Sequence, residues 1–199
     1  MNWYKVAIEG RAVPIHALYH FTSEQFGAMT REEKVALARN PSISPETQRL
    51  FFTEEYAGKR GDMYGALWSL ALNPSMIPEV QRLFFTEEYE NKGYALESLA
   101  LRKSIAPEVQ RLFFTEKYEK KGAVLWHLAS NPSLTSEVQR LFLTEKYEEK
   151  DNALSWLAKN EKFLRDFTRD ELLQIKKVAR GNPKLYVLKK RLEQLAGVP

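Results

Sequence analysis

The sequence predicts an all-α protein in which tandem helix pairs stack as an α-solenoid. The first observation is a phrase of twelve residues, Pro-Glu-Val-Gln-Arg-Leu-Phe-Phe-Thr-Glu-Glu-Tyr from Pro78, which recurs with changes from Pro45, Pro107 and Ser136. The second is a shared ending, Leu-Ala-x-Asn, that closes most second helices of the pairs. Repeats of 29 to 33 residues are typical of helical solenoids, because one helix pair cannot bury its apolar faces alone.

We expect one domain over residues 1–199, with atypical pieces at both ends. A solenoid needs such caps because its end faces are otherwise apolar. The expected parts are, in order, an N-terminal cap (1–13), a diverged repeat (14–40) whose first helix covers Pro14–Thr22, four repeats (41–160) and basic C-terminal capping helices (161–199).

Local signals place the helix ends. Proline follows the Asn at three of the repeat endings and stops the helix before it, whereas a proline followed by Glu suits the first turn of the next helix. Thr30 and Glu33 form one predicted capping box, after a connection over Ser23–Met29. The segment from Phe167 to Glu171 resembles a second capping box, with a helix to about Arg180 and a last, basic amphipathic helix over Lys184–Ala196.

The apolar pattern explains why the pairs must stack. In the helix from Pro78, Val80 and Phe84 share one face, while Phe85 and Tyr89 lie nearly opposite. A helix that is apolar on two sides is sandwiched between neighbours. The second helices are too short to persist alone and contribute a recurring buried set: Leu67, Leu70 and Ala71; Leu96, Leu99 and Ala100; Leu125, Leu128 and Ala129; Leu154, Leu157 and Ala158.

The pieces Ala-x-Asn-Pro-Ser and Pro-Glu-Val-Gln-x-Leu, repeated with a short second helix, resemble the variant leucine-rich repeat family. That family belongs among the HEAT- and armadillo-like solenoids. The resemblance covers roughly residues 31–160 and implies a right-handed superhelix without catalytic residues. The repeat here is longer than is usual for the family. The iron–sulfur cluster associated with the family needs cysteines, which this chain lacks, so we expect no cofactor.

The charge distribution separates the C-terminal segment from the repeats. The formal net charge is +4, but residues 161–199 hold ten Lys or Arg and five Asp or Glu. The other 160 residues hold 20 basic and 21 acidic residues, which is typical of a solvated surface. The basic end is interpreted first as a capping helix pair and alternatively as a contact for nucleic acid or an acidic partner through Lys176, Lys177, Arg180, Lys184, Lys189, Lys190 and Arg191. A helix lying on a membrane surface is the third interpretation.

Several other residues and patterns in the sequence do not indicate a functional site. The absence of cysteine excludes disulfides and thiolate metal sites, and no apolar run suggests a membrane span, so we expect a cytoplasmic protein. His16 and His20 have the spacing of two metal ligands, but no third ligand is evident nearby. Arg60-Gly61-Asp62 is interpreted as a coincidence. Without a phosphate loop or nucleophile elbow, the sequence indicates no enzyme and no metal. The near-identical repeats suggest a bacterial or viral accessory protein.

The candidate binding residues fall into two groups. Arg49, Arg82, Arg111 and Arg140 recur beside aromatic pairs such as Phe85 and Tyr89, and this ladder either contacts a peptide or nucleic acid or is buried as architecture. The second group varies between repeats and is the better candidate for specificity: Trp68, Glu97, Trp126 and Ser155 at one position, and Ser69, Ser98, His127 and Trp156 at the next. The sequence therefore predicts a non-catalytic module that binds a protein or peptide, with nucleic-acid binding as the alternative.

Overall fold

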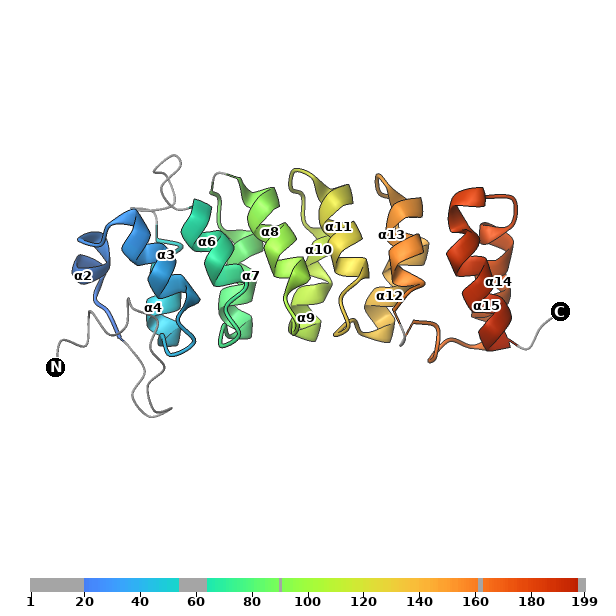
Figure 1. Cartoon of the computed structure of the whole chain (residues 1–199), viewed down its shortest axis with the longest axis horizontal. Helices are drawn as coiled ribbons and strands as arrows, with labels where there is room; N and C mark the ends of the chain where they lie inside the picture. The colour runs from blue at the N-terminus through green and yellow to red at the C-terminus, as the bar shows by residue number, and fades with distance from the viewer. Residues whose placement is uncertain (1–19, 54–63, 90, 161–162, 197–199) are drawn as a thin grey trace. The chain divides into compact units, whose positions relative to one another are not determined.

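The structure is a computed structural model that describes residues 20–53, 64–89, 91–160 and 163–196. Over these ranges the chain is helical and contains no strand, which confirms the all-α prediction (Figure 1). The chain divides into two compact units, Met1–Arg102 and Lys103–Pro199. The expected N-terminal cap, most of the Pro14–Thr22 helix, His16 and Arg60-Gly61-Asp62 lie outside the described residues.

The first unit contains two rows of helices. One row is formed by the second helices of successive pairs, where α6 packs between α3 and α8 (Figure 1), while α4 packs against α7 in the other row. The helices are, in chain order, α2 (Ser23–Gly27), α3 (Arg31–Arg39), α4 (Pro45–Leu50), α6 (Tyr64–Ala71), α7 (Pro78–Thr86) and α8 (Lys92–Leu101).

The second unit continues the helix pairs and ends in the C-terminal helices. The second helices α11 and α13 pack side by side, α10 and α12 each pack against the second helix of their own pair, and α14 packs against α15. The elements are α9 (Pro107–Gln110), α10 (Leu112–Thr115), α11 (Lys121–Ala129), α12 (Ser136–Thr144), α13 (Lys150–Leu157), α14 (Arg169–Ala179), the 3-10 turn η1 (Pro183–Leu185) and α15 (Tyr186–Ala196).

The helix ends follow the local signals, with two corrections. The capping boxes at Thr30 and Thr168 are both present, and prolines open α4, α7 and α9 as expected. The expected connection Ser23–Met29 instead contains α2, because Thr22 and Gln25 form a third capping box. The last helix begins at Tyr186 rather than Lys184, after the 3-10 turn η1.

The core consists of the apolar positions that recur from repeat to repeat. Val80, Phe84 and Phe85 are all buried, so α7 is enclosed on two sides as the pattern predicts, but α7 ends at Thr86 and Tyr89 lies beyond it rather than on its second face. Every Leu and Ala of the recurring second-helix set is buried as well. Because this set fills the contact between neighbouring second helices, only the outward positions of those helices remain available to a partner.

Candidate functional site

The repeated Asn residues at the ends of the second helices tie one helix pair to the next. Asn73 is buried, and its Nδ2 donates to the backbone oxygens of Ala38 at 2.7 Å and Asn40 at 2.9 Å in the preceding pair. Its Oδ1 accepts the backbone N–H of Ser75 at 2.9 Å. A buried side chain that satisfies backbone groups in two repeats is part of the scaffold rather than a binding site.

The same link persists where the residue type changes. Arg102 occupies the Asn position in the next pair, and its guanidinium donates to the backbone oxygens of Asn73 and Pro74. Burial lowers the pKa of Arg102, so the backbone acceptors are what stabilise the charge there. In the second unit Asn160 Nδ2 donates to the Asn131 oxygen at 2.9 Å.

The repeated Gln residues form a second set of backbone links. Gln110 is buried, and its Nε2 donates to the backbone oxygens of Ile105 and Ser133, both at 2.9 Å. Its Oε1 accepts the Thr135 N–H at 3.0 Å at the start of α12. Gln48 makes the corresponding three contacts in the first unit. Repetition of these glutamines is therefore explained by backbone hydrogen bonding between pairs.

A lysine closes the end of each regular first helix, and sequence reasoning missed it. Lys121 Nζ donates to the backbone oxygens of Phe114 and Glu116, and Lys92 and Lys150 make the same pair of bonds in their own repeats. Burial lowers the pKa of Lys121 and Lys150. In the sequence, this lysine can be recognised because it lies seven residues after the last aromatic position of the first helix. The helix dipole favours a positive charge at the C-terminal end of a helix.

The aromatic half of the expected Arg–aromatic ladder lies between repeats. In the second unit the Phe114 ring meets Phe142 edge to face at 4.9 Å between centroids, and Tyr147 lies 6.0 Å from Phe114. Phe52 and Phe84 repeat this contact at 4.9 Å in the first unit. The Tyr147 hydroxyl donates to the Phe142 backbone oxygen, and burial raises the pKa of the phenol. These aromatic side chains are architecture, because the neighbouring repeat needs them as its packing surface.

The arginine half of the ladder lies at the surface and pairs with glutamates. Arg49 lies 4.0 Å from Glu46, three residues earlier on the same helix. Arg111 lies 3.1 Å from Glu137 of the following pair, so this arginine links two repeats. Arg82 is exposed on α7. Exposed pairs of this kind contribute little to stability.

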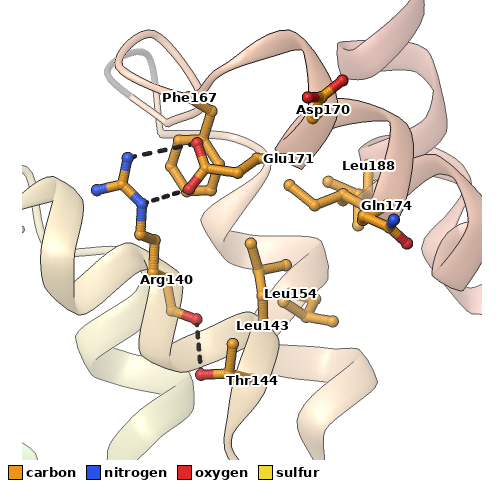
Figure 2. A pocket seen from close by; sticks show the side chains of 10 residues that line it. Arg140, Leu143, Thr144, Leu154, Phe167, Asp170, Glu171, Gln174 and Leu188 are labelled. Atoms are coloured by element: carbon orange, nitrogen blue, oxygen red, sulfur yellow. Dashed lines mark hydrogen bonds and ion pairs between the residues drawn. The ribbon is translucent and has the colours of Figure 1, made fainter.

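Arg140 has a different setting at the junction with α14 (Figure 2). Its Nε donates to Glu171 Oε1 at 2.7 Å, and its guanidinium lies 4.9 Å from the centre of the Phe167 ring. The hydrogen bond from Arg140 lowers the pKa of Glu171 to about 2. The ion pair thus holds together the last regular repeat and the first C-terminal helix.

Large apolar side chains lie on the outward face of the second helices in the first unit. Trp68 on α6 has 40% of its surface exposed, and Tyr94 and Leu101 on α8 have 39% and 53% exposed. Leu72 follows Trp68 by one helical turn, and half-buried Glu97 lies between Tyr94 and Leu101 on the same face. Two of the predicted positions, Trp68 and Glu97, therefore belong to one outward face of packed helices.

The second unit brings three of the predicted residues into contact. The rings of Trp126 and Trp156 are 5.9 Å apart, and the His127 ring lies 4.9 Å from Trp126. Trp156 is 39% exposed, and Lys159 Nζ lies 3.8 Å from the centre of its ring. We name this group, Trp126, His127, Trp156 and Lys159, the tryptophan cluster.

Tyr94, Leu101 and Lys159 were not among the predicted binding residues. Leu72, Leu101 and Lys159 lie four residues after Trp68, Glu97 and Ser155, respectively. The residue type at this third position therefore changes from Leu to Lys along the chain. Four residues is about one helical turn, so a comparison of this third position would have found Leu101 and Lys159, but not Tyr94, which lies three residues before Glu97. The structure was needed to show that their side chains face outward.

The predicted cationic residues are only partly brought together. Four of them line a groove of about 440 Å³ between α14 and α15, together with Leu173 and Glu193: Lys176, Lys177, Arg180 and Lys189. Lys184 and Lys190 are exposed but do not line this groove, and Arg191 is half-buried on α15. We name the hollow the basic groove.

The described residues show no group of three or more His, Asp or Glu side chains that could hold a metal ion. His20 lies on the surface, with Nδ1 3.2 Å from the Ser44 hydroxyl and 3.8 Å from the Glu46 carboxylate. Within the described ranges, none of the helices is both long and apolar enough to cross a membrane. Searches of protein-family models, curated proteins and solved structures found no match to this chain.

Proposed function

We propose that this protein is a non-catalytic module that binds a protein or an extended peptide on the outward face of its second helices. The proposal includes the right-handed α-solenoid implied by the resemblance to variant leucine-rich repeats. The observation that carries it is the tryptophan cluster, where the half-buried Trp126 ring meets the Trp156 ring, which is 39% exposed, at positions that vary between otherwise similar repeats. Exposed aromatic residues on a rigid scaffold are typical of binding hot spots.

The scaffold contacts support this choice by elimination. The repeated Asn, Gln, Lys and Phe side chains are occupied within the helix pairs, as described above for Asn73, Gln110, Lys121 and Phe114. Of the varying positions, Ser69 and Ser98 are buried, and the surface on which two such proteins would differ is formed by the others: Trp68, Glu97, Trp126, His127, Ser155 and Trp156. A constant frame with variable outward side chains is how repeat proteins acquire specificity.

A peptide-library selection on the purified full chain tests the proposal. Enriched peptides are synthesised with a fluorescent label, and their affinity is measured for the wild type and for the double variant Trp126→Ala and Trp156→Ala. We expect a loss of affinity of at least about tenfold, the order expected when hot-spot side chains are truncated. Leu173→Ala is the control, because Leu173 on α14 is as exposed as Trp156 but lies outside the cluster.

Two results would contradict the proposal. One is the absence of any enriched peptide family after selection on the folded protein. The other is a set of peptides that bind the double variant and the wild type equally well, since the two tryptophan rings would then contribute nothing to recognition.

A second candidate function is nucleic-acid binding through the C-terminal helices, and the basic groove favours it. Four cationic side chains face one hollow there, with Glu193 as the acidic member of its lining. Binding of this kind depends on counterion release, so it weakens steeply as salt concentration rises.

A salt titration with labelled single-stranded DNA and RNA tests this second candidate. Lys189→Glu is expected to weaken binding strongly because Lys189 lines the groove, whereas Lys190→Glu is a matched control one residue away and outside the lining. Absence of binding at low salt removes this candidate. Equal effects of the two substitutions would show a general charge effect rather than a site.

A further inference from the structure

A pocket of about 370 Å³ lies where α12 and α13 meet the C-terminal helices (Figure 2). Apolar side chains from four helices and the segment before α14 line it: Leu143, Leu154, Phe167, Ile175 and Leu188. The polar members of the lining are Arg140, Thr144, Asp170, Glu171 and Gln174. Apolar atoms form most of the lining surface although half of the lining residues are polar, and the size of the pocket is that of ligand-binding pockets, which span about 300–1,000 Å³.

The pocket exists because two aromatic residues of the repeat are replaced there. At the regular junction, Phe114 lies eight residues after the N-cap of its helix and packs against Phe142, seven residues after the next N-cap. The equivalent residues at the C-terminal junction are Leu143 and Ile175, counted from Thr135 and Thr168. Both rings of the regular contact are therefore absent, and smaller aliphatic side chains line the space.

Two further replacements make the rim polar. Glu171 and Gln174 lie three and six residues after the N-cap Thr168, where α12 carries Val138 and Leu141. Glu171 pairs with Arg140, which fixes one side of the rim. The Gln174 amide is exposed and carries both donors and an acceptor, and the exposed Asp170 carboxylate supplies further acceptors.

We infer that this pocket is the seat of an aromatic side chain of a bound peptide. The regular junction shows what this frame accommodates, namely a phenyl ring packed edge to face against its neighbours. An aromatic group entering the pocket would contact Leu143, Ile175 and the Phe167 ring. The peptide backbone around it would meet Thr144, Asp170 and Gln174, whose polar groups match peptide N–H and C=O groups. This inference rests on the proposed peptide-binding function.

The probe is N-acetyl-phenylalanine amide, titrated into the ¹⁵N-labelled full chain and followed by backbone amide chemical shifts. We expect saturable shifts at Leu143, Phe167 and Ile175. Leu143→Phe should weaken binding at least roughly tenfold, because its ring occupies the space intended for the ligand. Leu83→Phe, which makes the same change at a half-buried Leu on α7 outside the pocket, should leave binding unchanged.

Comparison probes decide the ligand class. N-acetyl-leucine amide should bind several-fold more weakly, and toluene should also bind more weakly because it has no amides to meet the rim. Saturation of the pocket shifts by toluene at equal or lower concentration would show a site for small apolar molecules and overturn the peptide assignment. Equal binding of the leucine amide would overturn the aromatic preference.

The titration of the wild-type protein tests whether the pocket binds an aromatic side chain, even where a variant fails to fold. Absence of saturable pocket shifts overturns it, as does unchanged binding to a folded Leu143→Phe protein. Ile175→Phe fills the same space from α14 and replaces Leu143→Phe if the latter loses its cooperative thermal transition. Selected peptides that need Trp126 and Trp156, combined with no binding of the phenylalanine amide, would remove the pocket seat alone. Pocket binding without any selected peptide would instead overturn the proposed function.

Discussion

The junctions on the two sides of α12 use the same positions and reach different results. On the side of α10, the rings of Phe114, Phe142 and Tyr147 close the space between helix pairs. On the side of α14, Leu143 and Ile175 leave a pocket of about 370 Å³. The comparison teaches that neighbouring helix pairs can pack together even when the aromatic rings between them are replaced by smaller side chains, provided that other contacts hold the helices together.

Those other contacts differ in kind between the two junctions. The filled junction has buried backbone links through Gln110 and edge-to-face aromatic contacts. The open junction depends on the Arg140–Glu171 ion pair, with Arg140 over the Phe167 ring, and on the hydrogen bonds of Ser155 and Asn182 across to neighbouring elements. We therefore expect the open junction to contribute less to stability than the filled one.

The largest expected difference between the junctions comes from truncating one side chain in each. Phe142→Ala should lower the free energy of unfolding by about 3–5 kcal/mol, because Phe142 is fully buried and its loss leaves a cavity. Leu143→Ala should cost about 1 kcal/mol, since this half-buried side chain already faces a pocket. Urea denaturation measures both values, and equal losses would contradict the comparison.

A smaller difference is expected for the polar contacts. Gln110→Ala should cost about 2–3 kcal/mol, because backbone groups of Ile105, Ser133 and Thr135 lose a buried partner. Gln174→Ala, at the rim of the pocket, should stay within about 0.5 kcal/mol of the wild type. The same denaturation experiment applies. A loss for Gln174 as large as that for Gln110 would show that the rim is structural.

The open junction should also respond to acid. The pKa of Glu171 is lowered from 4.5 to about 2, so its contribution to stability is complete above pH 4.5 and is lost as the pH falls to about 2. The difference in melting temperature between the wild type and Glu171→Gln should therefore shrink over this interval.

Asp170→Asn is the control for this pH dependence, because Asp170 has no ion pair in the part of the chain that the structure describes. A difference between the wild type and Glu171→Gln that stays constant down to the lowest pH would argue against the Arg140 contact as its source.

The smallest expected effect is a gain from closing the pocket. Leu143→Phe restores the ring that the regular junction carries at this position and should add about 0.5–1 kcal/mol to the free energy of unfolding, as cavity filling commonly does. Phe114→Leu makes the reverse change at the filled junction and should be destabilising. A loss of stability for Leu143→Phe would mean that the pocket walls cannot accept a ring in the repeat geometry.

Much of the local structure could be predicted because it depends on neighbouring residues. The capping boxes at Thr30 and Thr168 need only residues three apart, and a proline fixes the first turn of α7 without any tertiary contact. The buried Leu and Ala sets follow from periodicity alone. The third capping box at Thr22 follows the same rule with Gln in place of Glu, and its helix was missed because that segment was interpreted as a connection.

The sequence by itself determined which residues repeat, where most helices begin and end, and which faces are apolar. Only the tertiary structure decided why Asn73, Gln110 and Lys121 repeat, because their acceptors are backbone oxygens brought near by folding. It also decided that the aromatic rings are buried while Trp156 is exposed, and that two missing rings leave a pocket beside Leu143. Periodicity assigns a residue to a face, but the neighbour across that face determines whether it packs, bonds or remains open.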